Sequence, residues 1–425
     1  MYLKGSKWSM NRRRTRPNWF RIILLCLLVL GASYVNRFVI AARPSPFLPT
    51  PTVTRSPESF VTEAQEYFKQ GQLLRAIDSY KQAILSRPDD PTVYIALAQA
   101  QVFAGQYEAA QESAESAILL NNANSMAHAV LAWALGAQEK FIEAEDSIER
   151  ALTLDPNNAL AHAYYVEILV DSGSFDVIEK AIDESRIAVA LAPNTLETHR
   201  ARGIILEAVG DYENAIREYQ QAIDLNPKIA DLYLSLGINY RALGSYEDAI
   251  TAFSNADALN PEDPTPDFLT SRTYATRGEF GKAMQYAEQA VANDGADPSL
   301  RGNLGVMYYR NGYWTEALVE LGYVVDGGFT KDGVQIEAMP LVPNNIRLAE
   351  YYFTYGLALA RTNKCGEALN IARTILERIP ADELSVENAN AIISKCEQNL
   401  VQTPEPLPTS PETAPVSTET PTPTP

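Results

Sequence analysis

The amino-acid sequence predicts an all-α fold in which short helical hairpins stack in a row to form an α-solenoid. Residues 230–263 show the unit: Leu232 and Leu236 share one helical face, Gly244 interrupts the pattern, and a second apolar helix ends before Pro261. A hairpin of this length cannot bury both of its apolar faces by itself. Neighbouring copies of the unit must supply the missing cover.

The unit recurs with a period of 34 residues. One alanine near the start of each second helix marks nine copies, and six of the eight intervals between these alanines are 34 residues long: Ala76, Ala110, Ala144, Ala181, Ala215, Ala249, Ala283, Ala317 and Ala368. The matching position on the first helix is usually small: Ala64, Ala98, Ala132, Val166, Gly203, Gly237, Ser271, Gly305 and Gly356. Small side chains there allow the two helices to cross closely.

The repeated unit resembles the tetratricopeptide repeat. The residues that carry the family pattern are Tyr233, Leu236, Gly237, Tyr240, Gly244, Tyr246, Ala249, Phe253, Ala256 and Pro261. The resemblance implies a right-handed superhelix of nine repeats over residues 57–381, with the first helices lining a concave groove. An insertion at 326–345 lengthens one interval, and a polar helix over 382–400 is expected to cap the solenoid.

Charge is unevenly distributed along the 425 residues, whose formal net charge is −18. Residues 1–21 hold seven lysines and arginines and no acid, which leaves the remainder at −25. A body this acidic repels nucleic acid backbones. We therefore expect no nucleic acid partner.

The N-terminal region predicts a membrane anchor. Residues 1–18 are basic, and residues 19–42 form a largely apolar segment that is long enough to cross a bilayer as a helix. This segment carries no charge from Ile22 to Val35 and is then interrupted by Asn36 and Arg37. The basic flank predicts a cytoplasmic N-terminus and extracytoplasmic repeats in a single-pass protein of the cell membrane. The alternative is a cleaved signal peptide with its apolar core at 22–30, which would make the protein secreted. Both interpretations place the repeats outside the cytoplasm.

Proline-rich segments flank the repeats. Residues 43–56 predict a stiff, extended linker. Residues 401–425 consist mainly of Pro, Thr, Ser and Glu, which predicts a disordered tail. A glycosylated or wall-embedded stalk is the alternative for this tail.

Cys365 and Cys396 are candidates for a disulfide. Cys365 begins the second helix of the ninth repeat, and Cys396 lies near the end of the capping helix. Because successive helices run antiparallel, both cysteines are expected at the same level of the solenoid. A disulfide would persist outside the cytoplasm; two buried thiols are the alternative.

The resemblance also points to groove residues. The candidates are Phe103, Trp133, Tyr164, Arg200, Arg241, Arg272, Tyr309, Arg310 and Arg361. A row of arginines inside an acidic body predicts binding of an acidic, extended segment through bidentate pairs. The alternative is that these arginines neutralise neighbouring acids such as Glu197, Glu207 and Asp231.

The sequence offers no support for catalysis. His128, His162 and His199 occupy the same offset in successive repeats, too far apart to share a zinc ion, and are interpreted as packing residues. We find no nucleophile triad, phosphate loop or zinc spacing. We therefore expect no enzyme activity, no cofactor and no metal.

Together these patterns favour a non-catalytic scaffold that binds partner proteins of unknown identity in the cell envelope. One alternative is a structural, self-associating envelope protein. The other is a wall-glycan-binding accessory factor that would use Trp133, Tyr164 and Tyr309.

Overall fold

A computed structural model describes residues 19–34, 55–173 and 175–401 as two separate units, 1–56 and 57–425. In the first unit, α1 covers Trp19–Tyr34. Among the described residues, no helix combines the length and the apolar character needed to cross a membrane. The last part of the predicted 19–42 span lies outside the described residues. So do 1–18, most of the 43–56 linker, and the tail from residue 402 onward.

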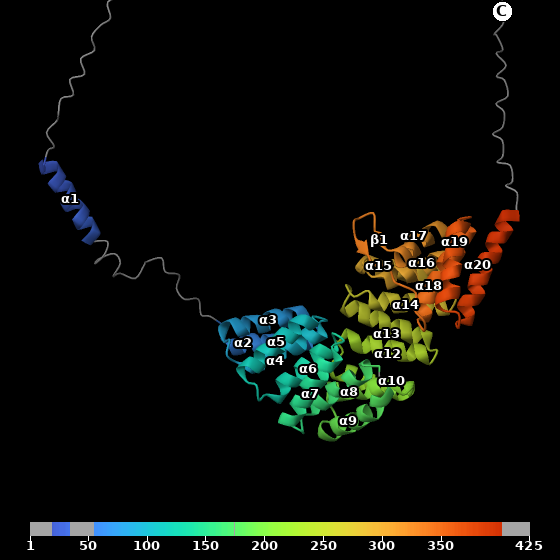
Figure 1. The fold of residues 1–425 in the computed structure, drawn as a ribbon. Coiled ribbons are helices and arrows are strands. Elements are labelled where there is room, and N and C mark those ends of the chain that lie inside the picture. Colours follow the sequence, from blue (N-terminus) through green and yellow to red (C-terminus); the bar gives the residue numbers. More distant parts are fainter. Residues whose placement is uncertain (1–18, 35–54, 174, 402–425) are drawn as a thin grey trace, which may run out of the picture. The chain divides into compact units, whose positions relative to one another are not determined.

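The second unit is a row of helical hairpins, each packed against the next (Figure 1). Within residues 57–378, leaving out residue 174, nine hairpins are formed by α2 (Pro57–Lys69) and α3 (Leu73–Ser86), α4 (Pro91–Phe103) and α5 (Tyr107–Leu120), α6 (Ser125–Gly136) and α7 (Phe141–Leu154), α8 (Ala159–Asp171) and α9 (Ile178–Leu191), α10 (Leu196–Ala208) and α11 (Tyr212–Leu225), α12 (Ala230–Ala242) and α13 (Tyr246–Leu259), α14 (Thr265–Thr276) and α15 (Phe280–Asn293), α16 (Pro298–Arg310) and α17 (Trp314–Asp326), and α18 (Ile346–Arg361) and α19 (Cys365–Arg378). A short 3-10 helix, Phe175–Val177, lengthens the fourth repeat. The final helix is α20, Glu383–Val401.

Close helix crossings explain the small residues at the repeated positions. A Cβ atom built on Gly237 of α12 would lie 2.4 Å from the ring of Phe253 on α13. Phe253 and Ala249 are both fully buried in this crossing. The glycine therefore lets an aromatic ring from the second helix lie directly against the backbone of the first.

Side chains at one offset tie each first helix to the loop before it. The Tyr94 hydroxyl donates to the Pro88 carbonyl (3.2 Å), and the Tyr233 hydroxyl donates to the Pro227 carbonyl (3.3 Å). The imidazole Nε2 of His128 donates to the Asn122 carbonyl at 3.0 Å, and that of His162 donates to the Pro156 carbonyl at 3.0 Å. These histidines replace tyrosines in a structural contact. Over the described residues, no cluster of three His, Cys, Asp or Glu residues could hold a metal ion.

The insertion adds a short β-hairpin to a fold whose other described elements are helices, so the all-α fold class is confirmed. Strands β1 (Gly328–Phe329) and β2 (Gln335–Ile336) pair antiparallel, with Gly328 opposite Ile336 and Phe329 opposite Gln335. Ile336 is buried, whereas Phe329 is exposed. The β-hairpin is attached to the solenoid because Ile336 packs into the core, whereas Phe329 does not.

The capping helix α20 covers the ninth hairpin. Cys365 at the start of α19 and Cys396 of α20 form a disulfide, and their Cα atoms lie 5.4 Å apart. Ile392 of α20 is fully buried and packs near Gly356 of α18. The cap therefore has both a covalent and an apolar attachment.

Candidate binding surface of the solenoid

An aromatic row runs along the first helices of the first four hairpins. The ring centroids of Phe68 and Phe103 lie 5.5 Å apart, those of Phe103 and Trp133 5.0 Å, and those of Trp133 and Tyr164 4.4 Å. The last two rings are stacked, with planes 7° apart. Trp133 is 4% exposed and Tyr164 is fully buried, while Phe103 is half-buried. The stacked pair therefore lies beneath the surface and forms what we call the aromatic floor. Because the faces of both rings are covered, Trp133 and Tyr164 are not free to stack on a sugar, as the glycan-binding alternative requires.

Arg200 of α10 neutralises acids on neighbouring helices. Its guanidinium lies 3.2 Å from the Glu167 carboxylate and 2.9 Å from that of Asp231. It also lies 5.4 Å from the Trp133 ring centroid, close enough for a cation–π contact. For Arg200, the structure therefore agrees with the alternative interpretation, in which the arginine neutralises neighbouring acids. The charge of the Arg200 guanidinium is already paired and is not available to an anionic ligand.

Glu167 is the most deeply buried acid of this region. Its Oε2 accepts a hydrogen bond of 2.8 Å from the Trp133 indole, while its Oε1 is buried and receives none from the described residues. Burial raises the pKa of the Glu167 carboxyl to about 7, against the opposing charge of Arg200. Sequence reasoning missed Glu167, because nothing in the repeat pattern marks an acid as buried.

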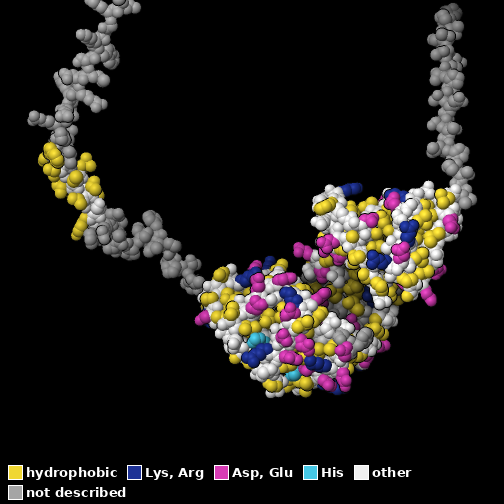
Figure 2. All heavy atoms as spheres, viewed as in Figure 1, with side chains coloured by type: hydrophobic (Ala, Val, Ile, Leu, Met, Phe, Trp, Pro, Cys, Tyr) yellow, Lys and Arg dark blue, Asp and Glu magenta, His cyan; other side chains and the backbone are white. Residues whose placement is uncertain are grey.

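A cavity of ≈ 860 Å³ opens above this aromatic floor, enclosed by the second to sixth hairpins. Its carboxylates outnumber its single arginine, and its lining includes Phe103, Tyr107, Trp133, Glu139, Glu167, Asp171, Arg200, Glu207, Asp231 and Asp263. Figure 2 shows that the surface is hollowed midway along the row of hairpins. We call this space the acidic cavity.

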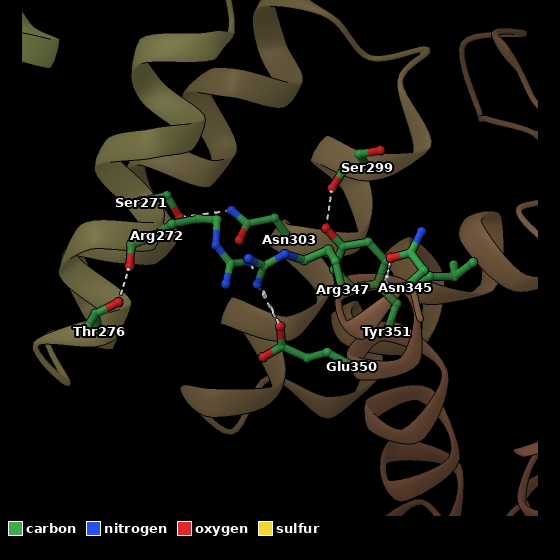
Figure 3. A network of polar contacts seen from close by, with 10 residues as sticks. Ser271, Arg272, Thr276, Ser299, Asn303, Asn345, Arg347, Glu350 and Tyr351 are labelled. Atoms are coloured by element: carbon green, nitrogen blue, oxygen red, sulfur yellow. Dashed lines mark hydrogen bonds and ion pairs between the residues drawn. The ribbon is translucent and has the colours of Figure 1, made fainter. Parts of the chain in front are cut away.

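A second polar region, the basic cluster, consists of Arg241 (α12), Arg272 (α14) and Arg347 (α18). Arg347 lies 2.9 Å from the Glu350 carboxylate, and Arg272 lies 3.9 Å from it. Figure 3 shows the guanidinium groups of Arg272 and Arg347 side by side, with Glu350 below them. Burial and the charge of Arg347 both lower the pKa of Arg241. In the part of the chain that the structure describes, Arg272 and Arg347 therefore share one carboxylate, and Arg241 lies close enough to Arg347 for its charge to be felt.

The remaining predicted arginines lie elsewhere. The Arg310 guanidinium is 5.7 Å from the Phe280 ring centroid. Arg361 donates through Nε to the Tyr309 hydroxyl (3.0 Å) and lies 5.3 Å from the Trp314 ring centroid. Both arginines are exposed. The five predicted arginines thus do not form one row, and Arg347, which the sequence analysis did not select, completes the cluster.

Comparison with protein families agrees with the geometry of the hairpins. Three family models, each described as a tetratricopeptide repeat, match residues 200–264 and 268–328, residues 67–134, and residues 127–158. These matches cover about half of the chain. The chain is a tetratricopeptide repeat protein. Its repeats form a scaffold for contacts with other proteins, which is the class of function that the sequence predicts.

The similar solved structures are distant from this tetratricopeptide repeat protein. A tetratricopeptide repeat protein from Parabacteroides merdae is 15% identical with a TM-score of 0.40, over 59% of this chain and 98% of that chain. PilW, described as a widely conserved type IV pilus biogenesis factor, is 20% identical with a TM-score of 0.43, over 47% of this chain and 91% of its own. No curated protein matches the chain. Identities this low transfer no partner from one protein to another.

Proposed function

We propose that this tetratricopeptide repeat protein is a non-catalytic scaffold that binds an acidic, extended segment of a partner protein at the basic cluster. The observation that carries the proposal is the charge imbalance of that cluster: Arg272 and Arg347 share the single carboxylate of Glu350, and Arg241, near Arg347, adds a third cation. Guanidinium groups bind carboxylates through short, charge-assisted hydrogen bonds. A glutamate or aspartate of the partner would relieve the repulsion between the arginines.

Arg241 is the residue of the cluster best suited to a ligand. Among the described residues, its side chain forms no ion pair, whereas Arg272 and Arg347 share Glu350. It is half-buried, and its pKa is lowered by burial and by Arg347. An incoming carboxylate would therefore find a guanidinium that has already lost part of its hydration and has no internal partner to give up.

The test compares two single substitutions in the full-length protein. Arg241→Gln removes a cluster cation without breaking an internal ion pair, and Arg217→Gln removes an exposed cation on α11 as the control. The probe is a fluorescently labelled peptide of four glutamates with blocked ends, and fluorescence anisotropy measures its dissociation constant. We expect Arg241→Gln to weaken binding about tenfold, the cost of one charged hydrogen bond. Equal affinities for the two variants would refute the acidic segment as the ligand.

We further propose that residues 19–42 anchor the protein in a membrane, with the repeats outside the cytoplasm. The support is the largely apolar segment 19–42, which six basic residues precede, together with the disulfide between Cys365 and Cys396, a bond typical of oxidising compartments. The described helix α1 covers the first part of this segment. Alkaline carbonate extraction should leave the full-length chain in the membrane pellet and release a chain that starts at residue 43. Release of both chains would refute the anchor.

A further inference from the structure

We propose that the acidic cavity is a second binding site, which receives a positively charged side chain, a lysine ammonium or an arginine guanidinium, from an extended segment of a partner protein. The cavity shares no residue with the basic cluster. Its occupation by a cation therefore does not depend on the acidic-segment proposal. The argument rests on uncompensated charge, on a buried oxygen without a donor, and on the size and walls of the cavity.

The negative charge of the cavity is only partly neutralised from within. Arg200 pairs with Glu167 and Asp231. Glu207 accepts hydrogen bonds from the neutral side chains of Asn239 (2.7 Å) and Tyr219 (3.1 Å). Within the described residues, Asp171 has neither a hydrogen bond nor an ion pair for its side chain, although it lines the cavity. Among the described residues, the Asp171 carboxylate thus lines the cavity without a cation paired to it.

The unfavourable electrostatic environment of Asp171 raises the pKa of its carboxyl group. Burial raises the pKa of its carboxyl, and the nearby charges of Asp231 and Glu207 raise it further, while Arg200 alone opposes them. By its accessible surface Asp171 is nevertheless exposed, because it borders the open space of the cavity. A cation bound beside Asp171 would be attracted by the carboxylate and would not have to displace an internal partner of Asp171.

A second, independent observation points to a hydrogen-bond donor at the same wall. Glu167 is 3% exposed and lines the cavity, and its Oε1 receives no hydrogen bond from any described residue. Buried carboxylate oxygens are nearly always paired, because an unpaired one loses its hydration without replacement. An ammonium or guanidinium group carries several N–H donors, so it can supply the missing bond as well as the charge.

The cavity has the size and the walls for a long side chain. Its volume of ≈ 860 Å³ lies within the range of about 300–1,000 Å³ that is typical of ligand sites. Phe103, Tyr107 and Ile204 line it together with the acids, so the apolar stem of a lysine or arginine would lie on carbon while the charged end meets carboxylates. The internal Arg200, held between Trp133, Glu167 and Asp231, already shows that this environment stabilises a guanidinium.

The curvature of the solenoid brings the first hairpin close to the loop before α12. Gly71, in the turn of the first hairpin, lies so close to Lys228, before α12, that a Cβ built on the glycine would be 2.5 Å from the lysine Cβ. The first hairpin thus meets the loop between the fifth and sixth hairpins. The hairpins between these two points line the cavity, so their carboxylates face a common concave space.

Fluorine NMR of the full-length protein labelled with 5-fluorotryptophan tests the proposal, because Trp133 lies in the cavity wall. The Trp133 signal is assigned by its absence in Trp133→Phe. The probes are end-blocked Ala-Lys-Ala, end-blocked Ala-norleucine-Ala, which has the apolar stem without the charge, and spermidine as a free polyamine. We expect the lysine peptide to shift the Trp133 signal in a saturable way and the norleucine peptide to leave it unmoved.

Matched substitutions identify the carboxylates. Asp171→Asn should weaken the lysine peptide about fivefold, and Asp263→Asn, which keeps an oxygen for its hydrogen bond with the Thr265 amide, should act in the same direction. Glu149→Gln removes an exposed acid that does not line the cavity and should leave the affinity unchanged. Equal shifts with the lysine and norleucine peptides, or unchanged affinity in both aspartate variants, would overturn the proposal. Binding of spermidine without the lysine peptide would also overturn it, since the occupant would then be a free polyamine.

Discussion

The buried carboxyl of Glu167 makes a sharp prediction about pH. Burial raises its pKa from an ordinary value of 4.5 to about 7 in the folded protein. Glu167→Gln keeps an oxygen that can accept the bond from the Trp133 indole but removes the ionisation. The experiment therefore compares the wild type with Glu167→Gln between pH 5 and pH 8.

The sign follows from proton uptake by the two states. Between pH 4.5 and about 7 the unfolded chain has lost the Glu167 proton, whereas the folded chain still holds it. The unfolded state binds fewer protons in this range, so the free energy of unfolding falls as the pH rises. The difference between the two pKa values corresponds to a loss on the order of 3 kcal/mol, complete above pH 7. The contribution of Glu167 is thus largest in acid and absent in mild base.

Urea titrations at each pH, followed by the fluorine NMR signal of Trp133 in protein labelled with 5-fluorotryptophan, measure this effect locally, since the chain holds four tryptophans. A local reporter is needed because the stability of a solenoid is distributed over repeats that can unfold separately. Burial also raises the pKa values of Asp171, Glu197 and Asp267, but both proteins share these groups. The difference between the two proteins should therefore change by up to about 3 kcal/mol across the range. Parallel pH profiles would refute the assignment of a raised pKa to Glu167.

Two further predictions concern packing and the cap. Gly237→Ala should lower the stability by about 1–3 kcal/mol, because the new Cβ would lie 2.4 Å from the Phe253 ring; Gly281→Ala, whose Cβ would meet nothing closer than 4.0 Å, is the control, and equal urea midpoints would contradict the crossing geometry. Replacing both Cys365 and Cys396 with serine should cost about 3–4 kcal/mol by releasing a loop with a sequence separation of 31. Hydrogen exchange should then quicken in α20 while α2 is unchanged, and unchanged protection of α20 would contradict a stabilising role for the disulfide.

The hairpins could be predicted because their signals are local. In the unit of residues 230–263, Gly244 has φ +78, a conformation that favours glycine, and it separates α12 from α13. The small residues at Gly237 and Ala249 meet at the crossing because helix packing depends on side-chain volume at fixed offsets. The insertion was also visible as an interruption, although its β-hairpin required contacts with the core that no local pattern records.

The binding surface was predicted less completely, because its chemistry depends on which hairpins face one another. The repeat pattern selected Arg272 as a groove residue but did not select Arg347. They meet because α14 and α18 both turn side chains toward Glu350. The repeat offsets predict which face of a helix lines the groove. They do not predict which residues of a hairpin two repeats away that face will contact.

The sequence by itself determined the fold class and the period, because both depend on residues within one 34-residue unit and its neighbouring copy. The role as a protein scaffold followed from the resemblance of that unit to the tetratricopeptide repeat. Only the tertiary structure decided where the charges meet: Arg200 among Glu167 and Asp231, and Arg241 near Arg347. The reason is physical. A small change of angle at every hairpin accumulates along the row, so the contacts across the groove are set by the sum of all the packing interfaces and not by any one of them.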